Sequence, residues 1–195
     1  MENLNQGNRC VSGIILKRAI TAEGGGSIFL FSRQHGTLWA SAPGCMRGKV
    51  RFGGSIEPLV FGRFQIYSSS SRTYLKSVDV KEDFWGIRKS PASLQRAFRW
   101  FSFVSDLLPV LTPDNELLKN LFWSLKLLET GCHPELAEHR FLRRWCGIWG
   151  VDPGTSLRSN GGDDWYLSMK EVAGEALSVF LSENANMLRC IREAL

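Results

Sequence analysis

The chain has 195 residues, of which 44% are hydrophobic and 22% are charged, a composition typical of a globular protein with one or two domains. Its net charge of +5 is concentrated in residues 1–80, which carry ten Lys/Arg against four acids, whereas residues 81–195 carry fourteen against fifteen. The five cysteines show no CxxC spacing, which argues against both a disulfide framework and a four-cysteine zinc site. No apolar run approaches the roughly 20 residues that span a bilayer, and the N-terminus lacks the apolar stretch of a secretory signal. We therefore expect a cytoplasmic protein without membrane contact, whose first half binds an anion.

The first half contains short apolar runs separated by turn residues. Five such runs predict strands, over residues 11–17, 28–31, 38–42, 60–66 and 72–80. No helical period separates them, so they indicate a small closed barrel. A five-stranded barrel with basic loops and exposed aromatics is typical of the OB fold, which often binds single strands of nucleic acid. The sequence therefore predicts an α+β protein whose first domain, residues 1–80, is an OB-fold barrel.

Residues 81–195 have the apolar spacing of an all-α domain. We expect Ser93 to cap the first helix. We expect the second helix to begin with a capping hydroxyl at Thr112 and to stop at Gly131. A third helix is predicted over residues 134–149 with Trp145 facing inward, and more helical sequence follows residue 168. This second domain is the predicted site of partner docking.

A basic run at residues 44–54 is the first candidate for contact with a polyanion. Arg47, Lys49 and Arg51 alternate there between glycines, without any acid. The other predicted phosphate-neutralising side chains of the first half are Lys17, Arg18, Arg33, Arg72 and Lys76. Phe52 and Trp39 either stack on unpaired bases or pack on the barrel.

Four pieces of the first half resemble, in order and spacing, the N-terminal domain of RecO, a bacterial recombination-mediator family. They are Gly13-Ile14-Ile15-Leu16-Lys17, Glu23 before an apolar strand, Phe31-Ser32-Arg33-Gln34-His35-Gly36, and the run 47–54 followed by Glu57-Pro58-Leu59. The resemblance covers residues 11–80 well and residues 81–153 loosely.

The resemblance implies an OB barrel followed by a helical domain, binding of single- and double-stranded DNA, and annealing of complementary strands. It also implies RecR and the acidic tail of the single-stranded-DNA-binding protein as partners, a role in loading the recombinase, and a place at the bacterial nucleoid. The family usually carries a cysteine zinc motif after the third helix, whereas residues 159–164 here contain no cysteine. We therefore expect no zinc finger, no bound metal and no cofactor.

The third predicted helix carries Arg140, Arg143 and Arg144 beside apolar Phe141 and Trp145. A basic edge next to an apolar groove suits a peptide that ends in acids and a phenylalanine, although a solvated basic face would show the same pattern. No catalytic triad, metal-hydrolase motif or nucleotide-binding motif is present in the sequence, so we expect a protein that is not an enzyme.

Two other interpretations fit the sequence. One is a protein-interaction adaptor whose barrel has weak or lost DNA binding. The other is an RNA-binding OB protein, because OB grooves accept both nucleic acids.

Overall fold

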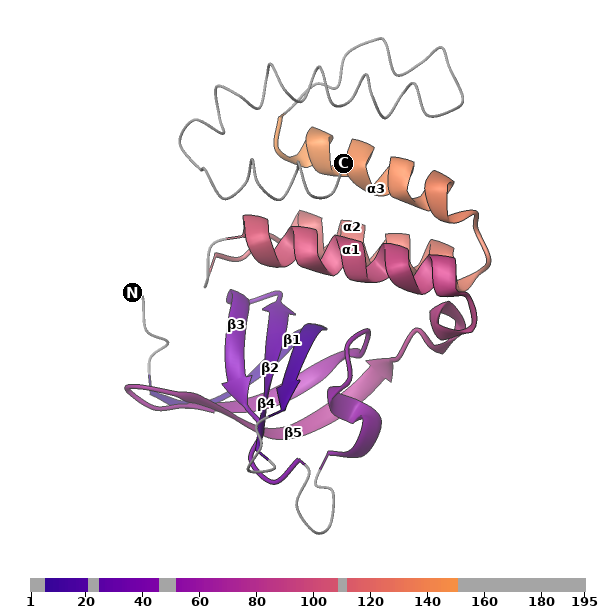
Figure 1. Ribbon diagram of the computed structural model, residues 1–195. Helices are drawn as coiled ribbons and strands as arrows, with labels where there is room; N and C mark the ends of the chain where they lie inside the picture. Colours follow the sequence, from indigo (N-terminus) through magenta and orange to yellow (C-terminus); the bar gives the residue numbers. More distant parts are fainter. Residues whose placement is uncertain (1–5, 21–24, 46–51, 109–111, 151–195) are drawn as a thin grey trace.

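The computed structural model describes residues 6–20, 25–45, 52–108 and 112–150. Five strands precede three helices, which confirms the predicted α+β class (Figure 1). The elements are β1 (Gly7–Ile20), β2 (Gly26–Ser32), β3 (Gly36–Ser41), η1 (Gly53–Ile56), β4 (Phe61–Ser68), β5 (Thr73–Glu82), η2 (Trp85–Lys89), α1 (Pro91–Leu107), α2 (Asn115–Glu129) and α3 (Pro134–Ile148).

The strands close into a barrel in the order β1-β2-β3-β5-β4. Four of the five pairings are antiparallel, and the fifth joins β3 to β5 in parallel through the pair Ser41 and Tyr74. β1 serves two neighbours, because Gly13 pairs with Ser32 of β2 and with Gly62 of β4. A Cβ at Gly13 would lie 2.2 Å from the carbonyl oxygen of Phe31, so only glycine permits this close approach of two strands.

Alternating side chains of the strands fill the barrel interior. On β3, Leu38 and Ala40 are buried while Trp39 between them is exposed, as the alternation of the sequence predicts. On β4, Phe64 and Ile66 point inward in the same way. We call this cluster the interior core; its buried members are Val11, Ile15, Ile28, Leu30, Leu38, Ala40, Ala42, Cys45, Ile56, Val60, Phe64, Ile66 and Leu75.

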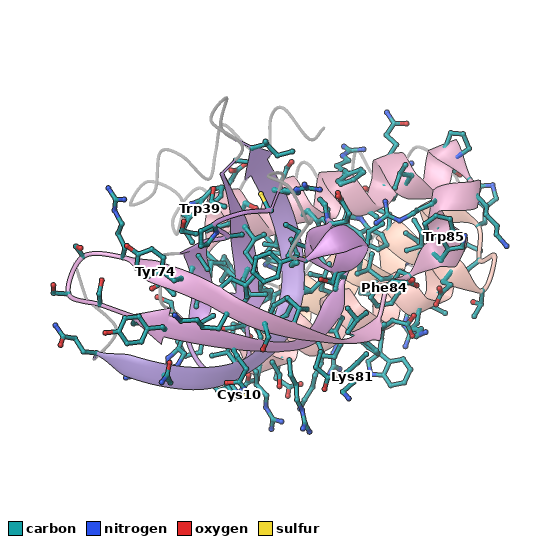
Figure 2. The ribbon with its side chains drawn as sticks, turned by 90° about the horizontal axis from the view of Figure 1, so that it is seen from below. Cys10, Trp39, Tyr74, Lys81, Phe84 and Trp85 are labelled. Atoms are coloured by element: carbon teal, nitrogen blue, oxygen red, sulfur yellow. The ribbon has the colours of Figure 1, made fainter. Side chains whose placement is uncertain are left out.

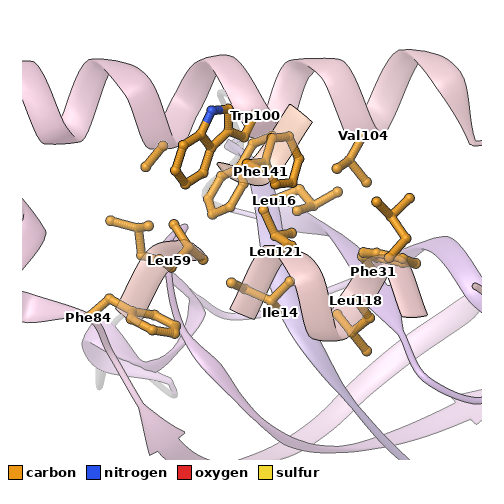
Figure 3. Packing of buried hydrophobic residues seen from close by; sticks show 14 of the residues in the cluster. Ile14, Leu16, Phe31, Leu59, Phe84, Trp100, Val104, Leu118, Leu121 and Phe141 are labelled. Atoms are coloured by element: carbon orange, nitrogen blue, oxygen red, sulfur yellow. The ribbon is translucent and has the colours of Figure 1, made fainter. Parts of the chain in front are cut away.

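A second apolar cluster lies between the barrel and the helices. Ile14 and Leu16 of β1 and Phe29 and Phe31 of β2 point outward from the barrel and belong to the same buried cluster as residues of all three helices. Figure 3 shows this packing, with Trp100 of α1 close to Phe141 of α3; their ring centroids are 4.8 Å apart. We call this cluster the interlayer core, because it fixes the helices over one face of the barrel (Figure 1).

Two helix caps differ from the prediction. α1 begins at Pro91, and its N-cap is Ser90, whose side chain accepts a hydrogen bond from the Ser93 backbone N–H. α2 is capped by Asp114 rather than Thr112, because the Asp114 carboxylate accepts from the Leu117 N–H at 2.9 Å. In both cases the cap sits next to the helix, as N-cap geometry requires, whereas the prediction was three residues too late in the first case and two too early in the second. The third helix lies where it was predicted.

Several predictions fall outside the described residues. They concern residues 46–51 of the basic run, the helices after residue 168 and the cysteine-free segment 159–164. Within the described residues, no helix is long and apolar enough to cross a membrane, and no group of His, Cys, Asp or Glu is arranged to hold a metal ion.

Candidate nucleic-acid interface

The sequence from the start of β2 to the middle of β5 is almost free of acids. Between Glu23 and Asp79 it contains seven Lys/Arg and a single acid, Glu57. The Glu57 carboxylate accepts a hydrogen bond from the Arg18 guanidinium and forms an ion pair with it. The one negative charge of this stretch is therefore neutralised within the barrel by Arg18 of β1.

Three of the predicted phosphate contacts are exposed on the barrel. Arg33 lies in the turn between β2 and β3, Arg72 lies at the tip of the β4–β5 hairpin, and Lys76 lies on β5. The turn at Arg33 is fixed by Ser32, whose hydroxyl donates to the Gly36 carbonyl and accepts from the His35 N–H. Lys76 places its Nζ 5.4 Å from the centroid of the Tyr67 ring.

Two other predicted cations form ion pairs with acids. Lys17 lies 3.9 Å from the Asp106 carboxylate of α1, and both side chains are about two-fifths exposed. Arg18 is held by Glu57, and only 14% of its side chain is exposed. An incoming phosphate would have to displace Glu57 to reach Arg18, so this arginine first of all ties β1 to the segment before β4.

The entry to the basic run lies at the opposite end of β2 from Arg33. Cys45, the last described residue before residues 46–51, is fully buried. It lies against Gly26 at the start of β2, because a Cβ placed on Gly26 would lie 2.6 Å from the Cys45 Sγ. Arg33 follows Ser32 at the other end of this seven-residue strand, roughly 20 Å away. Phe52, after the run, packs partly buried against the interior core. Arg47, Lys49 and Arg51 lie outside the described residues.

Aromatic side chains flank these cations on the outer surface of the barrel. Trp39 is 48% exposed and lies against Phe29, with ring centroids 4.9 Å apart, so it is half-buried and still open to solvent. Tyr67 and Tyr74 are partly exposed and pair directly across β4 and β5. The sequence analysis did not single out the two tyrosines. Their near-symmetric placement on either side of the polar tip at residues 68–71 is the signal that marks them as cross-strand neighbours.

A second cationic site lies on the helical layer. A cavity of about 900 Å³ opens between α2 and α3. Its lining includes Lys119, Arg140, Arg143, Arg144 and the indole of Trp123, which is 61% exposed. Glu116 lies at the same cavity and pairs with Lys119 at 2.6 Å and with Arg144 at 3.7 Å. The predicted trio of arginines therefore does border one groove.

Trp145, predicted as the apolar contact of that groove, is only 4% exposed. Its ring packs edge to face against Phe103 at 4.2 Å and Phe141 at 5.5 Å, so it belongs to the interlayer core and does not line the groove. The exposed indole at the groove is Trp123 of α2, which the sequence analysis missed because position 123 lies outside the apolar stripe of that helix.

His139 adds a titratable group to the groove. Its partial burial lowers the pKa of the imidazole, and the positive charge of Arg143 lowers it further. The negative charge of an acidic ligand in the groove would oppose the effect of the Arg143 charge on this pKa.

The strand order, the basic barrel surface and the helical layer together define an α+β protein with a cationic barrel. No protein-family model matches the chain. Six curated proteins do, and all are named DNA repair protein RecO. The chain is therefore similar to RecO proteins, which confirms the resemblance seen in the sequence.

Three of these relatives illustrate the extent of the match. The Acetivibrio thermocellus protein is 29% identical over 117 residues, 60% of this chain and 47% of its own length. The Exiguobacterium protein is 27% identical over 143 residues, 73% of this chain and 57% of its own length. The Myxococcus xanthus protein is 31% identical over 96 residues, 49% of this chain and 38% of its own length. The chain thus spans about half the length of the curated relatives it matches.

Proposed function

We propose that this protein is a DNA-binding recombination mediator in DNA repair. The observation that carries the proposal is the stretch from Glu23 to Asp79, whose sequence holds seven Lys/Arg and a single acid, Glu57, which Arg18 already neutralises. A surface of this kind attracts phosphates and releases their counterions. The relatives named DNA repair protein RecO support the same role.

The proposal assigns the barrel to the OB type and the chain to two domains. Closure in the order β1-β2-β3-β5-β4, with a parallel contact between β3 and β5, supports the OB assignment. Residues 1–80 form the nucleic-acid-binding unit, and residues 81–195 form the partner-docking unit. The two share the interlayer core, so they act as one body within the described residues.

In this role the barrel binds phosphates of single- and double-stranded DNA through Lys17, Arg33, Arg72 and Lys76. The basic run supplies Arg47, Lys49 and Arg51. Neutralising phosphates on two strands at once removes the repulsion that keeps complementary strands apart, which promotes annealing. No covalent step is needed, and no catalytic group takes part.

The groove between α2 and α3 is the proposed docking site for an acidic peptide such as the tail of the single-stranded-DNA-binding protein. Arg140, Arg143 and Lys119 supply charge at its border, and the exposed Trp123 offers an apolar face to a terminal aromatic residue. In the same role the protein works with RecR to load the recombinase.

Two triple variants with equal loss of charge test the proposal. The first changes Arg47, Lys49 and Arg51 to Ala, and the second changes Arg140, Arg143 and Arg144 to Ala. Each is titrated with fluorescent single-stranded DNA at several salt concentrations and with a fluorescent acidic peptide that ends in phenylalanine. We expect the barrel variant to bind DNA more weakly, with the salt slope reduced by about 2, because each lost phosphate contact removes about 0.7. The groove variant is expected to lose binding of the acidic peptide and to retain binding of DNA.

Each outcome discriminates between functions. DNA binding by the unaltered protein that does not depend on salt, or equal DNA binding by both variants, contradicts the proposal. Peptide binding without DNA binding identifies an adaptor. Much tighter binding to a matched RNA than to DNA identifies an RNA-binding protein. An annealing assay with complementary oligonucleotides then separates a mediator from a simple DNA-binding protein.

A further inference from the structure

A row of three aromatic side chains crosses the outer surface of the barrel on neighbouring strands. Trp39 comes from β3, Tyr74 from β5 and Tyr67 from β4. We call Trp39, Tyr74 and Tyr67 the aromatic row. Ser41 pairs with Tyr74, and Tyr74 pairs with Tyr67, so the register brings the three strands together at this place. Figure 2 shows Trp39 and Tyr74 on the part of the barrel next to the β4–β5 hairpin, far from Trp85.

The alternation of the strands directs all three rings outward. Leu38 and Ala40, the neighbours of Trp39, are buried in the interior core. Ile66 next to Tyr67 and Leu75 next to Tyr74 are buried there as well. Because successive side chains on a strand point to opposite faces, the aromatic row lies on the outer face. None of the three belongs to the interlayer core, and Trp39 borders it, because its ring lies against Phe29.

The spacing of the row suits stacked bases. Tyr74 and Tyr67 are cross-strand partners, about 5 Å apart, and Trp39 lies two residues before the partner of Tyr74, about 8 Å from it. A stacked strand rises about 3.4 Å per nucleotide, so the row has the length of about four bases.

The charge beside the row is also that of a nucleic-acid site. Lys76 lies over the Tyr67 ring, and Arg72 follows at the tip of the same hairpin. The sequence from Pro58 to Val78 holds three cations and no acid. A purely apolar docking partner would gain nothing from these cations, whereas a phosphate backbone next to stacked bases would contact both.

We propose that Trp39, Tyr74 and Tyr67 form a base-stacking platform for single-stranded DNA, with Lys76 and Arg72 beside it on the phosphates. This inference rests on the proposed function and adds to it the residues that contact bases rather than phosphates. The platform requires no base-specific hydrogen bond, so it accepts any unpaired sequence.

The test compares two 20-nucleotide probes of equal charge, oligo(dT) and an oligomer of abasic sites. The full chain is measured unaltered and as Trp39→Leu, Tyr74→Leu and the double variant. Leucine retains apolar contact with Phe29 at position 39, and Trp39→Phe and Tyr74→Phe keep a ring. Trp85→Ala, which removes another indole that is 60% exposed, is the matched control.

We expect the unaltered protein to prefer oligo(dT) over the abasic oligomer, and we expect each leucine variant to reduce that preference by about tenfold. Affinity for the abasic oligomer should stay within twofold, which shows that the variants are folded and that phosphate binding persists. The phenylalanine variants and Trp85→Ala should retain the preference.

Two results overturn the inference while leaving the proposed function intact. One is equal affinity of the unaltered protein for both probes. The other is a preference for oligo(dT) that survives in the double variant. Failure of the unaltered protein to bind either probe contradicts the proposed function itself.

Discussion

The barrel has two outer faces that differ in what covers them. On the β1–β2 face, Ile14, Leu16, Phe29 and Phe31 are buried under the helices. On β3, β5 and β4 near the β4–β5 hairpin, Trp39 and the two tyrosines remain at least partly exposed, and so do Arg72 and Lys76 beside them. One closed sheet thus uses its outer surface both as a packing surface and as a candidate binding surface. The aromatic side chains of the second face are therefore exposed although helices cover the neighbouring face of the same barrel.

The largest effect is expected from a core truncation on the covered face. Phe31 is fully buried between the barrel and the helices. Phe31→Ala should lower the free energy of unfolding by about 3–5 kcal/mol, because it leaves a cavity in the interlayer core. Trp39→Leu on the uncovered face should cost no more than about 1 kcal/mol. Urea denaturation measures both, and equal losses would remove the distinction between the two faces.

An intermediate effect is expected at the point where the two faces meet. A Cβ on Gly13 would lie 2.2 Å from the Phe31 carbonyl oxygen and 2.8 Å from the Ser32 Cα, both of which are backbone atoms. Gly13→Ala should therefore destabilise the protein by about 1–3 kcal/mol, the usual cost of overpacking. Gly54→Ala is the control, since no atom lies within 4 Å of its Cβ position. A neutral Gly13→Ala in thermal unfolding would show that β1 can shift away from β2.

The smallest effect concerns the ion pairs that hold the helices to the end of the barrel. Lys126 of α2 donates to Glu82 at the end of β5 and to Glu129 at 2.8 Å. Burial raises the pKa of Glu82, but the hydrogen bond from Lys126 and those from the backbone of Phe84 and Asp83 outweigh it and lower the pKa below 4.5. Because the folded pKa is depressed, the contribution of Glu82 to stability is fully present above pH 4.5 and is lost as the pH falls through the folded pKa.

Glu82→Gln should therefore cost up to about 1 kcal/mol near pH 7, and the difference from the unaltered protein should vanish in acid. Urea denaturation at a series of pH values measures it. Glu116→Gln removes a similar pair with Lys119 on the exposed side of α2 and should have less effect. A loss that persists unchanged at low pH would show that Glu82 acts through packing rather than charge.

The strands and the direction of their side chains were predictable because buried and exposed residues alternate along the sequence of a half-buried strand. Leu38, Trp39 and Ala40 illustrate this. The order of the strands around the barrel was not predicted, since local patterns do not specify which strands pair.

The site residues were harder to predict, because the groups that a side chain contacts come from distant parts of the chain. Arg18 looked like any exposed cation until the fold placed Glu57, 39 residues away, against it. Trp145 was expected both to face inward and to contact the groove, and the packing of its ring against Phe103 of α1 shows that only the first is true. The aromatic row comes from three strands, and the parallel contact of β3 with β5 brings them together. No periodicity in the sequence predicts that contact.

The interlayer core also matters during synthesis of the chain, because its barrel residues and its helix residues lie far apart in the sequence. The barrel strands are complete at Glu82, but α3 and Trp145 emerge about 60 residues later, which at roughly 5–20 residues per second is a delay of several seconds. During that interval the nascent chain presents Ile14, Leu16, Phe29 and Phe31 to water. An exposed apolar face of that kind invites aggregation. The interlayer core is therefore complete only once α3 has been made.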